Sequence, residues 1–219
     1  MKKVLVVNDI ADCGASYYRP FKCFGPRTTS VELLNLDPEA IALVVFTGGE
    51  DVTPSFYGAE ANPRTYNNPR RDAFEKKVFD RAVELGLPIA GICRGSQFLC
   101  AMSGGKLAQH ITHHGGSHPI VTDDGREIDV TSTHHQMQMP PEEAIPIAWA
   151  DPRRSKVYEG EPGELLEPDR EHDVVWYPHT NALGMQYHPE FMEKDSEGFL
   201  YSRELIERFF GLEVIEDGS

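Results

Sequence analysis

Continuous apolar runs of strand length recur along the chain. Three of them lie at residues 4–7, 41–46 and 88–92. Strands buried on both faces of a parallel sheet are apolar at almost every position, whereas a strand with one face in water alternates apolar and polar residues. These three runs therefore predict fully buried strands. Three later segments are also predicted as strands, at 127–132, 174–177 and 183–187.

Segments between and after these predicted strands have apolar residues at the spacing of a helix. Asn68 followed by Pro69 is typical of an N-cap and a first helical position. The helix that they open has apolar residues at helical spacing, namely Phe74, Val78, Ala82 and Leu85, and Gly86 ends it. Two further helices are predicted over 96–102 and 199–210. The alternation predicts an α/β fold, a three-layer sandwich in which helices cover both faces of a mostly parallel central sheet.

Length, charge and cysteine content limit the kind of protein. The 219 residues contain no linker, repeat or low-complexity tract, so one domain over 1–219 is expected. The apolar run after Met1 is too short for a secretory signal, and no run approaches the ~20 residues of a membrane span. Four cysteines are too few for a disulfide framework, which favours a cytoplasmic protein. A net charge of -14 disfavours nucleic acids and anionic membranes as partners.

The segment after the third apolar run holds one cysteine between two glycines. In Gly91-Ile92-Cys93-Arg94-Gly95 the glycines lie two residues before and after the cysteine, between a predicted strand and a predicted helix. A nucleophile elbow needs such small neighbours because its backbone turns sharply from strand into helix. Backbone N–H groups at the start of that helix favour a thiolate. Taken alone, the pentapeptide fits a structural cysteine at a strand end equally well.

A second motif near the end of the chain supplies the groups that a cysteine nucleophile needs. In Gln186-Tyr187-His188-Pro189-Glu190, an extended backbone would place His188 and Glu190 on the same face. A thiol nucleophile requires an imidazole to accept and return its proton, and the imidazole requires a carboxylate to orient it. Alone, the motif also fits a strand-end turn. Together with Cys93 it predicts a catalytic triad of Cys93, His188 and Glu190.

Six stretches of the sequence match the pattern of one known family. They are Thr47-Gly48-Gly49 with Asp51-Val52 and Pro54, Arg71-Asp72 with Phe74-Glu75, Gly91 to Gly95 with Gln97, Gly104-Gly105 with Leu107 and Gln109, Ser132 with His134-His135-Gln136, and Gln186 with His188-Pro189-Glu190. On these stretches the chain resembles the class I glutamine amidotransferase-like family and is most similar to its gamma-glutamyl hydrolase (peptidase C26) type. The resemblance implies a flavodoxin-like sheet, the same triad and no cofactor.

Further site residues follow from the chemistry and from this resemblance. Attack of a thiolate on an amide carbon places negative charge on oxygen, and the backbone N–H groups of Gly49 and Arg94 are the predicted donors to it. The resemblance implies that Gln97 contacts the substrate and that a second segment borders the glutamyl pocket through Ser132, His134 and His135. The alternatives are a plain glycine turn, a buried helix glutamine and solvated loop histidines. The segment 50–71 is either a lid that holds a substrate carboxylate or a surface loop.

Two other groups of residues are assigned no chemistry. His110, His113, His114 and His118 suggest a metal site, but glycines break the run and no Cys/His pair has zinc-finger spacing, so no metal is predicted. Cys13 and Cys23 are expected to be ordinary buried or loop thiols.

The predicted function is hydrolysis of a gamma-glutamyl amide through a Cys93 thioester, with glutamine favoured as the substrate. A self-sufficient gamma-glutamyl hydrolase that acts on a larger conjugate is the alternative. The segment 153–173 departs from the family pattern, which leaves the distal group of the substrate open but not the chemistry. A silent binding domain is disfavoured, since it has no need of the triad. The chain lacks a G-x-x-x-x-G-K-[ST] motif, so an ATP-dependent synthetase would be a separate polypeptide. A homo-oligomer is the other predicted partnership.

Overall fold

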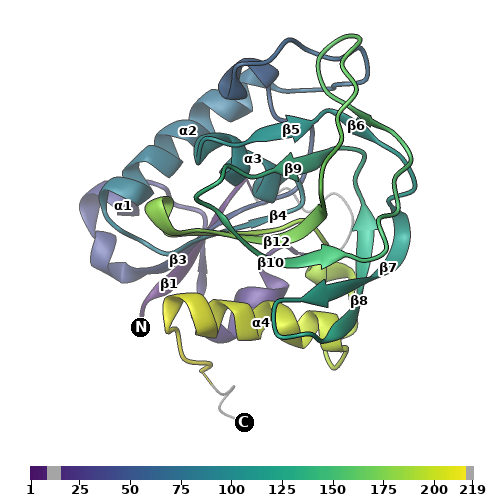
Figure 1. Ribbon diagram of the computed structural model, residues 1–219. Coiled ribbons are helices and arrows are strands. Elements are labelled where there is room, and N and C mark those ends of the chain that lie inside the picture. Colours follow the sequence, from purple (N-terminus) through teal and green to yellow (C-terminus); the bar gives the residue numbers. More distant parts are fainter. Residues whose placement is uncertain (9–15, 216–219) are drawn as a thin grey trace.

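A mixed sheet forms the centre of the molecule. The computed structural model describes residues 1–8 and 16–215. The strands of the sheet are β1 (Lys3–Val7), β2 (Arg27–Thr28), β3 (Ile41–Phe46), β4 (Ile89–Ile92), β7 (Gly115–Thr122), β8 (Glu127–Thr133), β10 (Ile145–Ala150), β12 (Glu171–Tyr177) and β13 (Ala182–Met185). In the described residues their order is β2-β1-β3-β4-β13-β12-β10-β7-β8 (Figure 1). Neighbours from β2 to β13 are parallel, and the later neighbours are antiparallel.

Helices cover both faces of this sheet. They are α1 (Leu33–Leu36), α2 (Pro69–Glu84), α3 (Arg94–Met102) and α4 (Glu197–Phe210), together with the short 3-10 segments η1 (Arg19–Phe24), η2 (Pro38–Ala40), η3 (Pro54–Tyr57), η4 (Pro178–Thr180) and η5 (Pro189–Phe191). Leu34, Phe79 and Phe98 place α1, α2 and α3 in one buried core, while Leu205 and Ile206 place α4 in the core on the opposite face (Figure 1). The predicted three-layer α/β fold is confirmed.

The buried parallel strands agree with the apolar runs that predicted them. β3 has the predicted bounds, and every residue of it is buried. β13 ends at Met185, two residues earlier than predicted, because the chain turns toward Pro189, where η5 begins. β7 and β10 were not predicted, since Pro119 and Pro146 interrupt their patterns. The two small sheets, β5 (Lys106–Ala108) with β9 (Met137–Met139) and β6 (His110–Ile111) with β11 (Tyr158–Glu159), are too short to give a pattern.

Helix α2 begins where the sequence predicts, and its buried face includes two acidic residues besides the predicted Val78 and Ala82. The side chain of Asn68 accepts a hydrogen bond from the backbone N–H of Arg71, so it is the N-cap. Phe74, expected on the apolar face, is 40% exposed. Asp72 and Glu75 are completely buried instead. An apolar pattern treats acidic residues as the solvent face of a helix, so it missed the burial of Asp72 and Glu75.

None of the helices within residues 1–8 and 16–215 combines the length and the apolar character that crossing a bilayer requires.

Candidate active site

Cys93 lies at the junction of β4 and α3 in a strained backbone conformation. Its φ is 51° and its ψ is -109°, in a region that residues with a side chain seldom occupy. The backbone N–H of Cys93 donates to the carbonyl oxygen of Met185 at 2.7 Å, and α3 begins with the next residue, two residues earlier than predicted. The cysteine is 8% exposed. This geometry is that of a nucleophile elbow at a helix N-terminus.

The two glycines around Cys93 are needed because the elbow packs backbone against backbone. A Cβ atom at Gly91 would lie 2.5 Å from the carbonyl carbon of Gly95. A Cβ atom at Gly95 would overlap the carbonyl oxygen of Phe46, the last residue of β3. Neither obstacle is the end of a flexible side chain, so the backbone itself would have to move.

Gly95→Ala is therefore expected to lower stability and to disturb the elbow. Overpacking at a rigid site costs about 1–3 kcal/mol, which is measured as a lower denaturation midpoint together with slower alkylation of Cys93. Gly115→Ala is the matched control, because Gly115 has ordinary backbone angles and no atom within 4 Å of a Cβ atom there. Equal midpoints for the two variants would contradict the steric explanation of the elbow.

His188 and Glu190 are in direct contact. Nδ1 of His188 lies 2.7 Å from Oε1 of Glu190, and the carboxylate is fully buried. The pairing comes from the 3-10 turn η5 rather than from the extended backbone that the sequence predicts. Thr131 fixes the backbone of the imidazole residue, because its hydroxyl donates to the carbonyl oxygen of His188 at 2.8 Å and accepts from the His188 N–H at 3.2 Å.

The environment of His188 favours the imidazolium. Burial alone favours the neutral ring, but the Cys93 and Glu190 side chains interact with it and together raise the pKa of His188 to about 10. The other ring nitrogen, Nε2, is buried and makes no hydrogen bond of standard geometry to any described residue, so it remains available to the thiol of Cys93. An imidazolium beside a cysteine is the arrangement that stabilises a thiolate.

A cavity of ≈ 170 Å³ brings most of the sequence-predicted residues together around Cys93. Its wall includes Gly49, Cys93, Arg94, Gln97, His134 and His135. Ser132 is not among its lining residues, because the Ser132 hydroxyl donates to the carbonyl oxygen of His114 at 2.9 Å, between β8 and β7. The neighbouring Thr133 lines the cavity instead. Side chains of successive residues point to opposite faces of a strand, so Ser132 and Thr133 point in opposite directions and only Thr133 reaches the cavity.

The polar residues of the wall are held by different partners. The amide Nε2 of Gln97 donates to the carbonyl oxygen of Gln136 at 3.0 Å. His134 has Nδ1 2.8 Å from that same oxygen, and burial holds the pKa of His134 well below its usual range. His135 has Nε2 3.1 Å from Oδ1 of Asp51, and this hydrogen bond raises the pKa of His135. The two imidazoles of the cavity therefore have pKa values that are shifted in opposite directions.

The segment 50–71 contributes to the site, and two of its three arginines, Arg64 and Arg71, are paired with protein groups. Asp51 and Tyr66 line the cavity, and neither was predicted to do so as an individual site residue. Arg64 makes an ion pair with Glu159 at 2.9 Å. Arg71 donates to Glu75 and to the carbonyl oxygen of Gly48, and Tyr57 is buried. The two paired arginines are not positioned as a lid for a substrate carboxylate.

The other histidines and cysteines have separate environments. Nε2 of His118 lies 3.2 Å from Oδ2 of Asp173, and Nε2 of His114 lies 3.3 Å from Oε1 of Glu171. In the part of the chain that the structure describes, no three His, Cys, Asp or Glu side chains are arranged to hold a metal ion. Burial raises the pKa of the Cys100 thiol to about 12. Cys23 is partly buried, and Cys13 lies outside the described residues.

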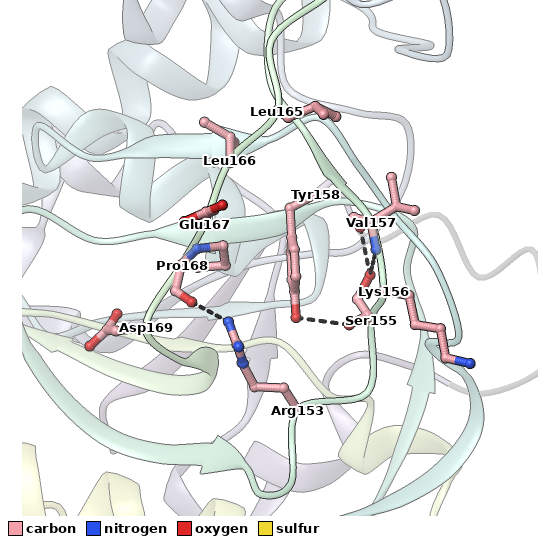
Figure 2. A pocket seen from close by; sticks show the side chains of 10 residues that line it. All are labelled: Arg153, Ser155, Lys156, Val157, Tyr158, Leu165, Leu166, Glu167, Pro168 and Asp169. Carbon is pink, nitrogen blue, oxygen red and sulfur yellow. Dashed lines mark hydrogen bonds between the residues drawn. The ribbon is translucent and has the colours of Figure 1, made fainter.

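A larger cavity, of ≈ 780 Å³, lies along the segment 153–169 and shares no lining residue with the one at Cys93 (Figure 2). Arg153 donates to the carbonyl oxygen of Pro168 at 2.6 Å. Figure 2 shows this hydrogen bond and the hydroxyl of Tyr158 beside Ser155. Its wall contains neither a cysteine nor a histidine. The smaller cavity is therefore the candidate active site, although it has less volume.

Comparisons with known proteins identify a family and several relatives. A family model described as Peptidase C26 matches residues 27–157, well over half of the chain. A Mycobacterium tuberculosis protein named as a candidate glutamine amidotransferase is 32% identical over 205 residues, which are 80% of this chain and 61% of that protein. The carbamoyl phosphate synthase small chain of Vibrio vulnificus is 35% identical over 112 residues, which are 50% of this chain and 24% of that protein. This chain thus spans less than two thirds of either relative.

The fold also matches solved structures. A Thermoplasma acidophilum crystal structure, described as a candidate component of GMP synthase, aligns with a TM-score of 0.60 at 15% identity and covers 97% of this chain and 94% of that one. At this level of identity the match speaks for the fold alone.

Proposed function

Because this chain belongs to the peptidase C26 family, within the class I glutamine amidotransferase group, we propose that it hydrolyses a gamma-glutamyl amide, with glutamine as the favoured substrate. One observation carries the proposal most directly. Cys93 occupies a nucleophile elbow and interacts with an imidazole that Glu190 holds at 2.7 Å. Two distant parts of the sequence thus interact, and of these three residues Cys93 lines the cavity of ≈ 170 Å³.

The reaction that this arrangement supports has two steps. The Cys93 thiolate attacks the amide carbon, and the C–N bond breaks as the His188 imidazolium donates its proton to the leaving nitrogen. Ammonia leaves when glutamine is the substrate, and a thioester remains. Water then attacks the thioester while neutral His188 accepts a proton, the C–S bond breaks, and glutamate is released.

Backbone donors stabilise the charge that develops on the carbonyl oxygen. Gly49 and Arg94 both line the cavity beside Cys93, and we assign their N–H groups to the oxyanion hole. Each such donor is worth on the order of 100- to 1000-fold in rate. Gln97, His134 and His135 are the side chains assigned to the glutamyl group.

The size of the cavity and the relatives favour glutamine over a large conjugate. A volume of ≈ 170 Å³ suits a glutamyl group, so a bulky leaving group would extend past Tyr66, a lining residue that is 81% exposed. The carbamoyl phosphate synthase small chain is among the relatives. This relationship supports a role in which ammonia passes to a separate ATP-dependent synthetase.

A comparison of substrates tests the proposal. The purified chain is expected to release glutamate from glutamine slowly, because a protein that supplies ammonia to a synthetase is organised fully only when that partner binds. Released glutamate is measured with glutamine and with several gamma-glutamyl amides, and Cys93→Ala is the control. Turnover of a gamma-glutamyl conjugate far above the rate on glutamine would establish the self-sufficient hydrolase instead. No glutamate from any of these substrates would refute both.

A further inference from the structure

Two carboxylates of α2 are buried behind the candidate oxyanion hole. Asp72 and Glu75 are both 0% exposed, and neither contributes to the wall of the cavity at Cys93. An ionised carboxylate is rarely buried without a structural or chemical reason, because removing its charge from water is costly. Their partners show what they connect.

The first partner is the residue that follows the nucleophile. The guanidinium of Arg94 is 1% exposed and donates to Oδ1 of Asp72 and to Oε2 of Glu75. It also lies over the ring of Phe98, 5.1 Å from the ring centre. The Arg94 side chain is thus anchored from α2, and its own backbone N–H is a proposed oxyanion donor.

The second partner holds the other side of the oxyanion hole. Arg71 donates from Nε to Oε1 of Glu75 at 2.8 Å. Its Nη2 donates to the carbonyl oxygens of Thr47 at 3.2 Å and of Gly48 at 2.8 Å. A Cβ atom at Gly49 would overlap Nη1 of Arg71, so the absence of a side chain there makes room for this guanidinium. Glu75 therefore orients the arginine that fixes the Thr47–Gly49 turn.

The third partner comes from the end of β1. The side-chain amide of Asn8 donates to Oε1 of Glu75 at 2.8 Å, and the carbonyl oxygen of Asn8 accepts from the Thr47 hydroxyl at 2.9 Å. β1, β3 and β4 are neighbours in the sheet. Glu75 thus joins the carboxyl ends of three adjacent strands.

The geometry points to Glu75 as a positioning residue that sets the N–H groups of Gly49 and Arg94 relative to each other. This inference rests on the proposed function, because it assumes that an oxyanion forms between those two groups. Asp72 accepts a hydrogen bond from Arg94 but none from Arg71, and its other oxygen accepts from the backbone N–H of Thr53 at 2.8 Å. Glu75 alone of the two carboxylates contacts both arginines.

Glu75→Gln separates this role from general stability. The amide keeps the shape of the carboxylate, but one of its two ends becomes an NH₂ donor. Whichever way it turns, that donor faces Arg94 on one side or Arg71 and Asn8 on the other. We expect kcat for glutamate release to fall about 10- to 100-fold, with KM within about 3-fold, since displaced donors lose transition-state stabilisation only.

Alkylation of Cys93 by iodoacetamide gives the readout that a merely structural role would not produce. In this reaction the thiolate forms an S–C bond at a saturated carbon and iodide leaves, so no oxyanion develops. Mass spectrometry is expected to show the same alkylation rate, within about 2-fold, in Glu75→Gln and in the parent protein. Glu84→Gln is the matched control, because Glu84 lies on the same helix and pairs with Arg81 on the surface at 2.6 Å.

The outcomes are distinct. Loss of hydrolysis with unchanged alkylation supports the positioning role. Equal loss of both, or hydrolysis within about 2-fold of the parent, overturns it. A parent protein that is alkylated at Cys93 but releases no glutamate refutes the proposed function, and this inference with it. If Glu75→Gln does not fold, Arg71→Lys tests the same link, because lysine keeps the charge but loses the fork that reaches Thr47 and Gly48.

Discussion

Cys93→Ala is expected to abolish release of glutamate from glutamine and from every other gamma-glutamyl amide. Without the thiolate no thioester forms, and neither the imidazole nor the backbone donors can replace a covalent nucleophile. A loss of at least about 10⁴-fold in kcat is expected, comparable with the removal of a nucleophile from other triads. The buried fold should persist, because Cys93 contributes little volume to the core and the two glycines that permit the elbow remain.

Covalent labelling identifies the same atom by an independent route. A glutamine-derived diazoketone should modify Cys93 and leave Cys13, Cys23 and Cys100 unmodified. Cys100 is the informative comparison, because burial raises the pKa of its thiol to about 12 and it therefore remains protonated. Cys100→Ala should still be labelled at Cys93. Label on another cysteine, or an active alanine variant at position 93, would sink the assignment of Cys93.

The strands of the parallel half of the sheet were predictable because a strand buried on both faces is a continuous run of apolar residues. β3 has every residue buried, so its apolar run coincides with the strand. The antiparallel strands have a less regular sequence pattern. In β7, glycines and a proline replace the expected alternation, and Pro119 is still paired opposite Asp129. β7 is a strand because it pairs with its neighbours in the sheet, and such pairing cannot be seen in the periodicity of a sequence.

The elbow was predictable for a different reason. Gly91 and Gly95 are glycines because each lies against backbone, and spacing within five residues is visible in a sequence. The pairing of His188 with Glu190 was also local, although the backbone between them is a 3-10 turn rather than a strand.

The support behind the oxyanion hole was not predictable from pattern alone. Glu75 and Asp72 belong to a helix whose charged residues are normally assigned to solvent. Only the folded chain shows that Arg94 from another helix and Asn8 from another strand converge on them. Sequence pattern also does not show which of two neighbouring residues faces the cavity. Ser132 was predicted to do so, but Thr133, the next residue of β8, lines the cavity instead.

The last prediction concerns the imidazole and the carboxylate that orients it. His188→Ala should lose activity by about 10⁴-fold or more, because it removes the imidazole that accepts and returns the proton of Cys93. Glu190→Gln should lose less, on the order of 10²- to 10⁴-fold, since the ring persists but is held less well. Both are measured as kcat for glutamate release on folded protein.

The pKa of His188 provides a check that does not depend on turnover. In the parent protein it is raised to about 10, against the effect of burial, by Cys93 and Glu190 together. Removing one negative partner destabilises the imidazolium, so NMR titration of the ring in Glu190→Gln should give a lower pKa, and Cys93→Ala should lower it as well. The two side chains act on the same ring, so the combined effect of both substitutions need not equal the sum of the single ones. Full activity in Glu190→Gln, together with an unchanged pKa of His188, would remove Glu190 from the triad and leave the buried carboxylate without a catalytic role.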